Sequence, residues 1–425
     1  MEKNVLAASI DFSGDFSQIC YFDGFMREPE SLSTIYNDKR YLIPSSIWFS
    51  DDGKHICYGD EAVRCSKGDK GIMADNLIGM FEKGGSVTVA GTDYEPGQLI
   101  EKYFSYLFSL IRQNKDMGKP DFIAVTIENL TENMIMLIGD ILKKEGYPQE
   151  NITVISHGEA FLYYSLSREK ELIANDVAMF DYNKDYFRYR RFNIIRNRHP
   201  QIIDTVEEDF TADVPYSLLD SEEGRRGADK IIAEFANAEF KKHVVSAVYL
   251  TGSGFYKEWM EQSLQYICSR RRVFKGYNLF VKGACYAAME KAGCIEYKDM
   301  IFKCSTRTHA DIKIMVKHDG NEIPVILSKA GKNWYEAGAK LDCITDGSSR
   351  VDFIIESKVS GVSRNVSVDL SGFPERPAKT TRIGITIGYT GKDKCVLCVE
   401  DKGFGDFFKA SGKISKKVVD MKEYL

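Results

Sequence analysis

The first 294 residues carry the same order of sequence signals twice. An apolar strand at residues 4–11 ends at Asp11, and residues 17–22 suggest a returning strand. Residues 177–180 repeat the apolar strand and reach Asp181, before a long strand pair and further strand and helix signals. A duplicated α/β unit predicts two lobes around a cleft, with any ligand at the carboxyl ends of the strands.

Hydrophobic periodicity predicts the remaining elements of this α/β region. In the first repeat we expect strands at 43–49, 122–127 and 152–155 and helices at 94–113, 131–145 and 159–170. In the second repeat we expect a strand at 247–250 and helices at 227–240, 256–269 and 283–292.

The pattern becomes all-β from about residue 299. A hairpin is expected from strands at 312–317 and 323–327, joined by His318-Asp-Gly-Asn321. Further strands are expected at 351–355, 366–370, 382–387 and 395–399. In the strand at 382–387, the apolar residues 383, 385 and 387 fall on one face. These short strands predict a β-sandwich, with a short apolar segment before it.

Composition excludes several classes of protein. A formal charge of −5 argues against a nucleic-acid binder, which needs clustered cations. No apolar run approaches the roughly 20 residues of a membrane-spanning helix, and we expect no cleavable signal peptide at residues 1–4 and the short apolar stretch that follows. The ten cysteines are scattered, and Cys395 and Cys398 lie on opposite faces of a strand, so we expect structural cysteines. These features favour a cytoplasmic protein without nucleic-acid or membrane partners; they give no oligomeric state.

Short motifs follow one another in an informative order. They are Tyr41-Leu-Ile-Pro-Ser-Ser-Ile-Trp-Phe49, Val154-Ile-Ser-His-Gly-Glu-Ala160, Val177-Ala-Met-Phe-Asp181, Leu250-Thr-Gly-Ser-Gly254, Met300-Ile-Phe-Lys303 and Val366-Ser-Val-Asp-Leu-Ser-Gly-Phe-Pro374. In this series the chain resembles the seventy-kilodalton heat-shock chaperones, the DnaK-like branch of the actin-like ATPase fold. The resemblance implies a duplicated actin-like α/β domain at 1–296, an apolar linker at 297–304, and a peptide-binding β-sandwich without a helical lid at 305–425.

The resemblance also implies a nucleotide site for ATP or ADP with Mg²⁺. The positions that match its phosphate and adenosine loops are Asp11, Ser13, Gly14, Asp181, Lys184, Gly252, Ser253 and Gly254. Asp11 and Asp181 would face the metal. Each position also has a structural interpretation: the aspartates cap turns, Lys184 is a surface residue, and the glycines form a tight turn with Ser253 as a helix cap.

The chain departs from the family where phosphate chemistry would occur. Glycine-rich loops bind phosphates because bare backbone N–H groups approach the oxygens, whereas Asp15 would repel them here. Tyr182 follows Asp181 where the family has glycine. The family's catalytic lysine falls at Asp75 and its water-positioning glutamate at His157. His157 is either a substituted catalytic group or, the interpretation that we favour, a residue at the start of a helix. We therefore assign no catalytic residue.

Three functions are compatible with these residues. The first is a non-catalytic pseudo-ATPase that binds an extended peptide or a protein client through the β-domain. The alternative is a working ATP-dependent chaperone with an altered site, and a weaker one is a small-molecule kinase of the same fold. The arginines between 188 and 198 form either a surface for an acidic partner or one solvated face of a hairpin, and we favour the solvated face.

Overall fold

The computed structural model describes residues 5–23, 25–26, 28–34, 40–114, 118–297, 299–304, 306–391 and 393–424. The chain divides into two compact units. The first unit contains residues 1–193 and 206–297, and the second contains residues 194–205 and 298–425. In the part of the chain that the structure describes, no helix combines the length and apolar character needed to cross a membrane.

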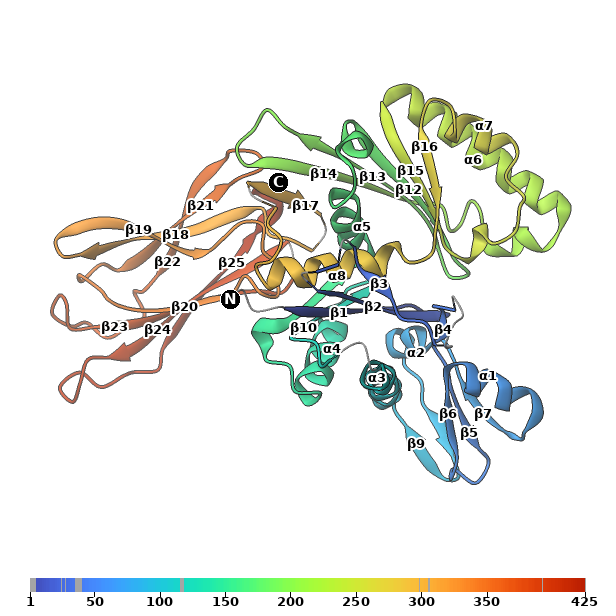
Figure 1. Cartoon of the computed structure of the whole chain (residues 1–425). Helices are drawn as coiled ribbons and strands as arrows, with labels where there is room; N and C mark the ends of the chain where they lie inside the picture. The colour runs from blue at the N-terminus through green and yellow to red at the C-terminus, as the bar shows by residue number, and fades with distance from the viewer. Residues whose placement is uncertain are drawn as a thin grey trace. The chain divides into compact units, whose positions relative to one another are not determined.

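The first unit is built on two sheets with the same pairing plan (Figure 1). In each sheet, two strands on one side of a central strand run parallel to it, and one strand on its other side runs antiparallel. In the first sheet these are β11 (Ile152–Ser156), β10 (Phe122–Ile127), β1 (Leu6–Phe12) and β2 (Phe16–Asp23). In the second they are β16 (Arg272–Lys275), β15 (Val245–Thr251), β12 (Asp176–Tyr182) and β13 (Phe187–Ile195), followed by β14 (Gln201–Asp209). The repeat in sequence is therefore a repeat in topology.

Helices pack against these sheets where the sequence places apolar stripes. They are α3 (Pro96–Gln113), α4 (Glu132–Lys144), α5 (His157–Leu166), α6 (Glu222–Lys242) and α8 (Leu279–Lys291). α3 begins with proline at its first position and a capping box between Glu95 and Gln98. α8 packs so tightly on α5 that a Cβ on Gly283 would lie only 2.0 Å from the carbonyl oxygen of Ala160. Glycine at this position lets the two helices approach closely.

Smaller elements complete the first unit. They are β3 (Glu30–Ser31), β4 (Ile43–Pro44), β5 (Ile47–Ser50), β6 (Ile56–Tyr58), α1 (Gly59–Gly68), β7 (Gly71–Ala74), α2 (Leu77–Lys83), β8 (Val87–Val89), β9 (Thr92–Tyr94) and α7 (Gln262–Ile267). Short 3₁₀ turns lie at Gln149–Asn151, Lys170–Ile173, Tyr216–Asp220 and Ser253–Phe255. α1 and α2 were not predicted, since α1 fully buries only Gly59 and Ala62, α2 fully buries only Leu77, and neither has a long apolar stripe.

Three expected elements are shorter or interrupted. The strand expected at 43–49 is divided into β4 and β5, with the Ser45 N–H donating instead to the Asp15 carbonyl. The helix expected at 159–170 ends at Leu166. The helix expected at 256–269 is reduced to α7, whose first backbone N–H groups are capped by the Asp229 carboxylate of α6. A cap supplied by a distant helix leaves no local signal at the helix start.

The second unit contains two four-stranded antiparallel sheets (Figure 1). One sheet has the order β19 (Asn321–Ser328), β18 (Ala310–His318), β21 (Arg350–Ser357) and β22 (Ser363–Asp369). The other has the order β20 (Ala339–Ile344), β23 (Arg382–Tyr389), β24 (Lys394–Gly403) and β25 (Ile414–Asp420). The side chains at 383, 385 and 387 are buried on one face as the alternation predicts. A last 3₁₀ turn covers Met421–Tyr424.

The segment expected as a linker forms a strand. β17 (Met300–Lys303) pairs in parallel with residues 201–204 of β14, and this pairing lies within the second unit. Ile301 and Phe302 are buried, and the Lys303 ammonium lies 3.0 Å from the Asp204 carboxylate. Lys298, inside the expected linker 297–304, lies outside the described residues. The apolar character of this segment is therefore used for strand pairing and burial.

Candidate functional site

Strand ends bring the polar residues of the candidate site together. Asp11 lies near the end of β1, and Glu128 and His157 directly follow β10 and β11. β1, β10 and β11 run parallel to one another, so their carboxyl ends meet at one edge of the first sheet. Asp181 occupies the equivalent place in β12 of the second sheet. The two edges meet inside the first unit.

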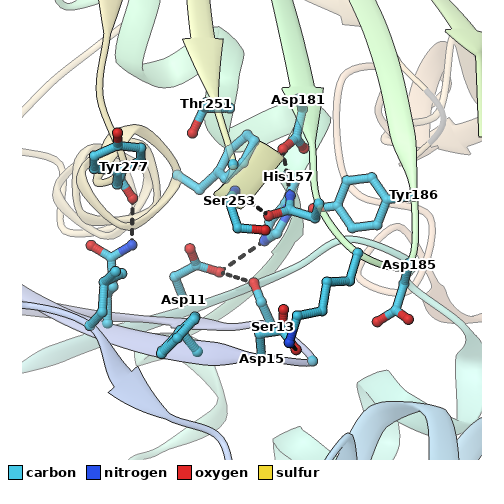
Figure 2. A pocket seen from close by; sticks show the side chains of 18 of the residues that line it. Asp11, Ser13, Asp15, His157, Asp181, Asp185, Tyr186, Thr251, Ser253 and Tyr277 are labelled. Atoms are coloured by element: carbon cyan, nitrogen blue, oxygen red, sulfur yellow. Dashed lines mark hydrogen bonds and ion pairs between the residues drawn. The ribbon is translucent and has the colours of Figure 1, made fainter. Parts of the chain in front are cut away.

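His157 joins Asp11 to Glu128. Figure 2 shows its contact with Asp11. Its Nε2 atom lies 2.9 Å from Asp11 Oδ1, and its Nδ1 atom lies 3.1 Å from Glu128 Oε2. The imidazole is 1% exposed and stacks on Phe280, with ring centroids 4.0 Å apart. Burial alone would lower the pKa of His157, but the carboxylates of Asp11 and Glu128 outweigh it and raise the pKa to about 10. His157 is therefore a buried cation at neutral pH.

Arg190 neutralises the other half of the site. Its guanidinium lies 3.2 Å from Asp181 Oδ2, 2.5 Å from Glu128 Oε1 and 2.8 Å from Glu207 Oε2. Burial would raise the pKa of Glu128, but Arg190 and His157 lower it to about 2. Burial and the Glu128 carboxylate raise the pKa of Asp181 to about 7 despite Arg190. We call Asp11, Glu128, His157, Asp181 and Arg190 the buried ion network.

The network contains one group of side chains with the spacing of metal ligands. Ligand atoms of Glu128, His157 and Asp181 all lie within 4.8 Å of one another. Arg190 donates to Glu128 and Asp181, so a metal ion at this point would have to displace a guanidinium. The chain supplies its own positive charge where such an ion would bind.

A recess borders the network within the first unit (Figure 2). Its empty volume is about 590 Å³, with the open solvent at its mouth included. Seven of the expected cofactor contacts line it: Asp11, Ser13, Gly14, Asp181, Lys184, Gly252 and Ser253. Gly254 and Asp75 are not among the lining residues. The structure therefore gathers most of the expected residues around one recess.

Short polar contacts fix the loops that surround the recess. Ser13 Oγ donates to Asp11 over 3.0 Å, and the Asn183 side-chain amide donates to Asp181 over 2.8 Å. Lys184, from the loop after β12, lies 3.3 Å from the carboxylate of Asp15, from the loop after β1. This ion pair connects the two loops directly.

The glycines expected in an adenosine loop contact a tyrosine. A Cβ on Gly252 would lie 2.3 Å from the carbonyl oxygen of Tyr182, and one on Gly254 would lie 2.5 Å from its ring. Gly252 also has a φ of +97°, which glycine adopts without strain. Tyr182 is fully buried and donates from its hydroxyl to Pro215. Close packing against Tyr182 is thus a sufficient reason for both glycines.

Sequence reasoning missed Glu128 and the role of Arg190. Glu128 follows the buried strand 122–127, and that position at a carboxyl end was the available signal. The preferred interpretation of the arginines as one solvated face is wrong for Arg190 and Arg191, which are 5% and 8% exposed. Arg191 pairs with Asp176 and, over 2.9 Å, with Glu239. These arginines are buried because carboxylates from other elements surround them.

Comparisons with known families give a classification without an activity. Residues 28–305 match a family described as "Family of unknown function (DUF5716) C-terminal", and residues 307–421 match a "Domain of unknown function (DUF8552)". A comparison with curated proteins found no match. Because the first match covers more than half of the 425 residues, the chain belongs to the DUF5716 C-terminal family.

Proposed function

We propose that this protein is a non-catalytic, chaperone-like binding protein: a pseudo-ATPase of the actin-like fold that binds a peptide or protein client through its β-sandwich. The observation that carries the proposal is the buried ion network. Each aspartate expected to face Mg²⁺ is paired with a cation of the same chain, Asp11 with His157 and Asp181 with Arg190. The duplicated strand plan of the first unit supports the fold assignment.

The residues of the site do not fit a magnesium ion. Mg²⁺ needs oxygen ligands in octahedral geometry. Asp11 and Asp181 would have to release His157 and Arg190 to provide those oxygens, which would leave two buried cations beside a dication. Such an arrangement is strongly unfavourable at low dielectric.

The loops around the recess do not fit phosphates. Asp15 and Asp185 line the recess where the family has glycines and threonines, so carboxylates would face phosphate oxygens. Lys184 is the one lysine among the lining residues, and it already pairs with Asp15. Anion binding through bare backbone N–H groups is therefore opposed by charge.

The second unit offers apolar surface for a client. Large apolar side chains are exposed on β18, β19 and β20: Met315, Ile323, Ile326 and Ile344. β19 and β20 are edge strands of their sheets. An extended segment can pair with such an edge, with backbone hydrogen bonds providing affinity and side-chain contacts providing selectivity. These features support binding of an extended apolar peptide.

Steady-state ATP hydrolysis tests the catalytic half of the proposal. We expect the purified chain to turn over MgATP below about 0.01 per second, because His157 and Asp75 cannot supply the charge stabilisation and water positioning that phosphoryl transfer needs. Asp11→Ala should leave the residual rate unchanged. A faster rate that disappears in Asp11→Ala would favour the working-ATPase alternative.

Fluorescence anisotropy with labelled apolar peptides tests the binding half. We expect the full chain to bind with a Kd of tens of micromolar, or about −6 to −7 kcal/mol. Ile326→Asp should weaken binding at least about tenfold, since it places a charge on the face of β18 and β19 that also exposes Met315. Lys340→Ala, an exposed change on β20, is the matched control. Absence of peptide binding below about 1 mM, together with self-association or a folded partner, would replace the peptide proposal with a docking module.

A further inference from the structure

Two thiols meet at a corner of the first unit, away from the recess. Cys57 lies in β6 and Cys65 in α1, and their Sγ atoms are 3.3 Å apart. Both side chains are partly exposed. This separation is shorter than an ordinary sulfur–sulfur contact, and a disulfide would need the sulfurs to approach by little more than 1 Å to reach about 2.05 Å.

The local fold holds the two cysteines in this position. α1 starts directly after β6, at Gly59 with a φ of +57°, and packs against β6. A Cβ on Gly59 would lie 2.9 Å from the Tyr106 hydroxyl, so the corner is tightly packed. Tyr58 stacks on Tyr106 with ring centroids 5.2 Å apart. The cysteines are therefore brought together by the backbone path.

We propose that Cys57 and Cys65 form a reversible intramolecular disulfide when the protein meets a small-molecule disulfide such as oxidised glutathione. One cysteine thiolate attacks a sulfur of the small disulfide, which releases one small thiolate and leaves a mixed disulfide. The second cysteine then attacks the protein sulfur of the mixed disulfide, which forms the Cys57–Cys65 bond and releases the second small thiol. The pair loses two electrons and two protons, and the small disulfide gains them.

The two cysteines differ in their surroundings. Burial, with a smaller contribution from the Cys65 thiol, raises the pKa of Cys57 to about 11. Attack requires the thiolate, so Cys57 is poorly suited to the first step. Cys65 then carries the mixed disulfide. Cys57 resolves it despite its raised pKa, because this second attack is intramolecular and the two sulfurs are held 3.3 Å apart. The resulting bond closes a short loop and ties α1 to β6, which should slow hydrogen exchange of the α1 amides.

Trypsin mapping of the full-length protein tests this inference. Arg64 lies between the two cysteines, so trypsin separates residues 55–64 from residues 65–67. After treatment with oxidised glutathione and blocking of free thiols, we expect mass spectrometry to find these two peptides joined, with the loss of two alkylatable thiols. Dithiothreitol should restore both. Cys57→Ser should instead leave glutathione on Cys65.

Exposed single cysteines provide the matched control. Cys268 and Cys294 are exposed, and in the same samples they report that the oxidant reached the protein. A joined peptide that forms only in urea would contradict the inference, because the folded backbone would then not be holding the pair. Glutathione on Cys268 and Cys294 without any joined peptide, or a bond found only between two chains on a non-reducing gel, would also overturn it.

Discussion

Replacing His157 with glutamine is expected to destabilise the first unit by about 3–5 kcal/mol. The substitution leaves the Asp11 and Glu128 carboxylates without their buried cation, and breaking one side of a buried ion pair costs far more than losing a surface pair. Urea unfolding followed through Trp259, which lies in the core of this unit, measures the change.

Two further variants separate this effect from ordinary loss of packing. His55→Gln changes an exposed histidine and should leave the free energy of unfolding within about 0.5 kcal/mol of wild type. Adding Asp11→Asn to His157→Gln should recover part of the loss, because it removes one of the two uncompensated charges. Equal stability of wild type and His157→Gln would show that the pairing seen in the buried ion network does not exist in solution.

Asp401→Ala should be the most damaging single substitution in the second unit, with a loss of about 3–5 kcal/mol. Asp401 is fully buried, and its carboxylate accepts two hydrogen bonds from the Arg376 guanidinium, over 2.7 and 2.9 Å. It also accepts hydrogen bonds from the Ser411 hydroxyl and the Gly403 N–H. The alanine variant leaves Arg376 buried without its partner. Asp406→Ala, an exposed change in the adjacent loop, should have little effect.

Acid provides a second measurement of the same carboxylate. Burial would raise the pKa of Asp401, but Arg376 and Ser411 hold it well below the usual 3.8. Its contribution is therefore fully present above about pH 3.8 and is lost as the pH falls further. In a chain with Trp48 and Trp259 replaced by phenylalanine, Trp334 fluorescence follows unfolding of the second unit. In this chain, Asp401→Ala should reduce the fall in the free energy of unfolding as the pH drops below about 3.8. An equal fall in the free energy of unfolding with and without Asp401→Ala would contradict this assignment.

Much of the architecture could be predicted because its signals are local. The strand at 122–127 matches β10, and the apolar stripe of 94–113 matches the buried face of α3. Asp11 and Asp181 were placed at equivalent strand ends. α1 was missed because it fully buries only Gly59 and Ala62. Periodicity can locate only those helices that bury a face.

The chemistry of the site could not be predicted in the same way. Arg190 lies 62 residues from Glu128 in the chain, and their contact requires both sheets to be in place. The pattern of β13 alone indicates a polar strand and says nothing about which carboxylates surround each arginine. His157 was seen as a residue at a helix start, which it is, but its partners come from two other strands. Ion pairs between segments that are distant in the chain produce no regular residue spacing that sequence analysis can detect.

Calorimetric titration of MgATP and MgADP into the full-length protein tests the central claim most directly. We predict no saturable binding and no nucleotide-dependent change in Tm, because the buried ion network already occupies the charges that a magnesium nucleotide would need. A binding nucleotide at 100 times its Kd would stabilise the protein by about 2.7 kcal/mol, which a melting curve resolves easily. Saturable MgATP binding with a matching rise in Tm, both lost in Asp11→Ala, would contradict the account.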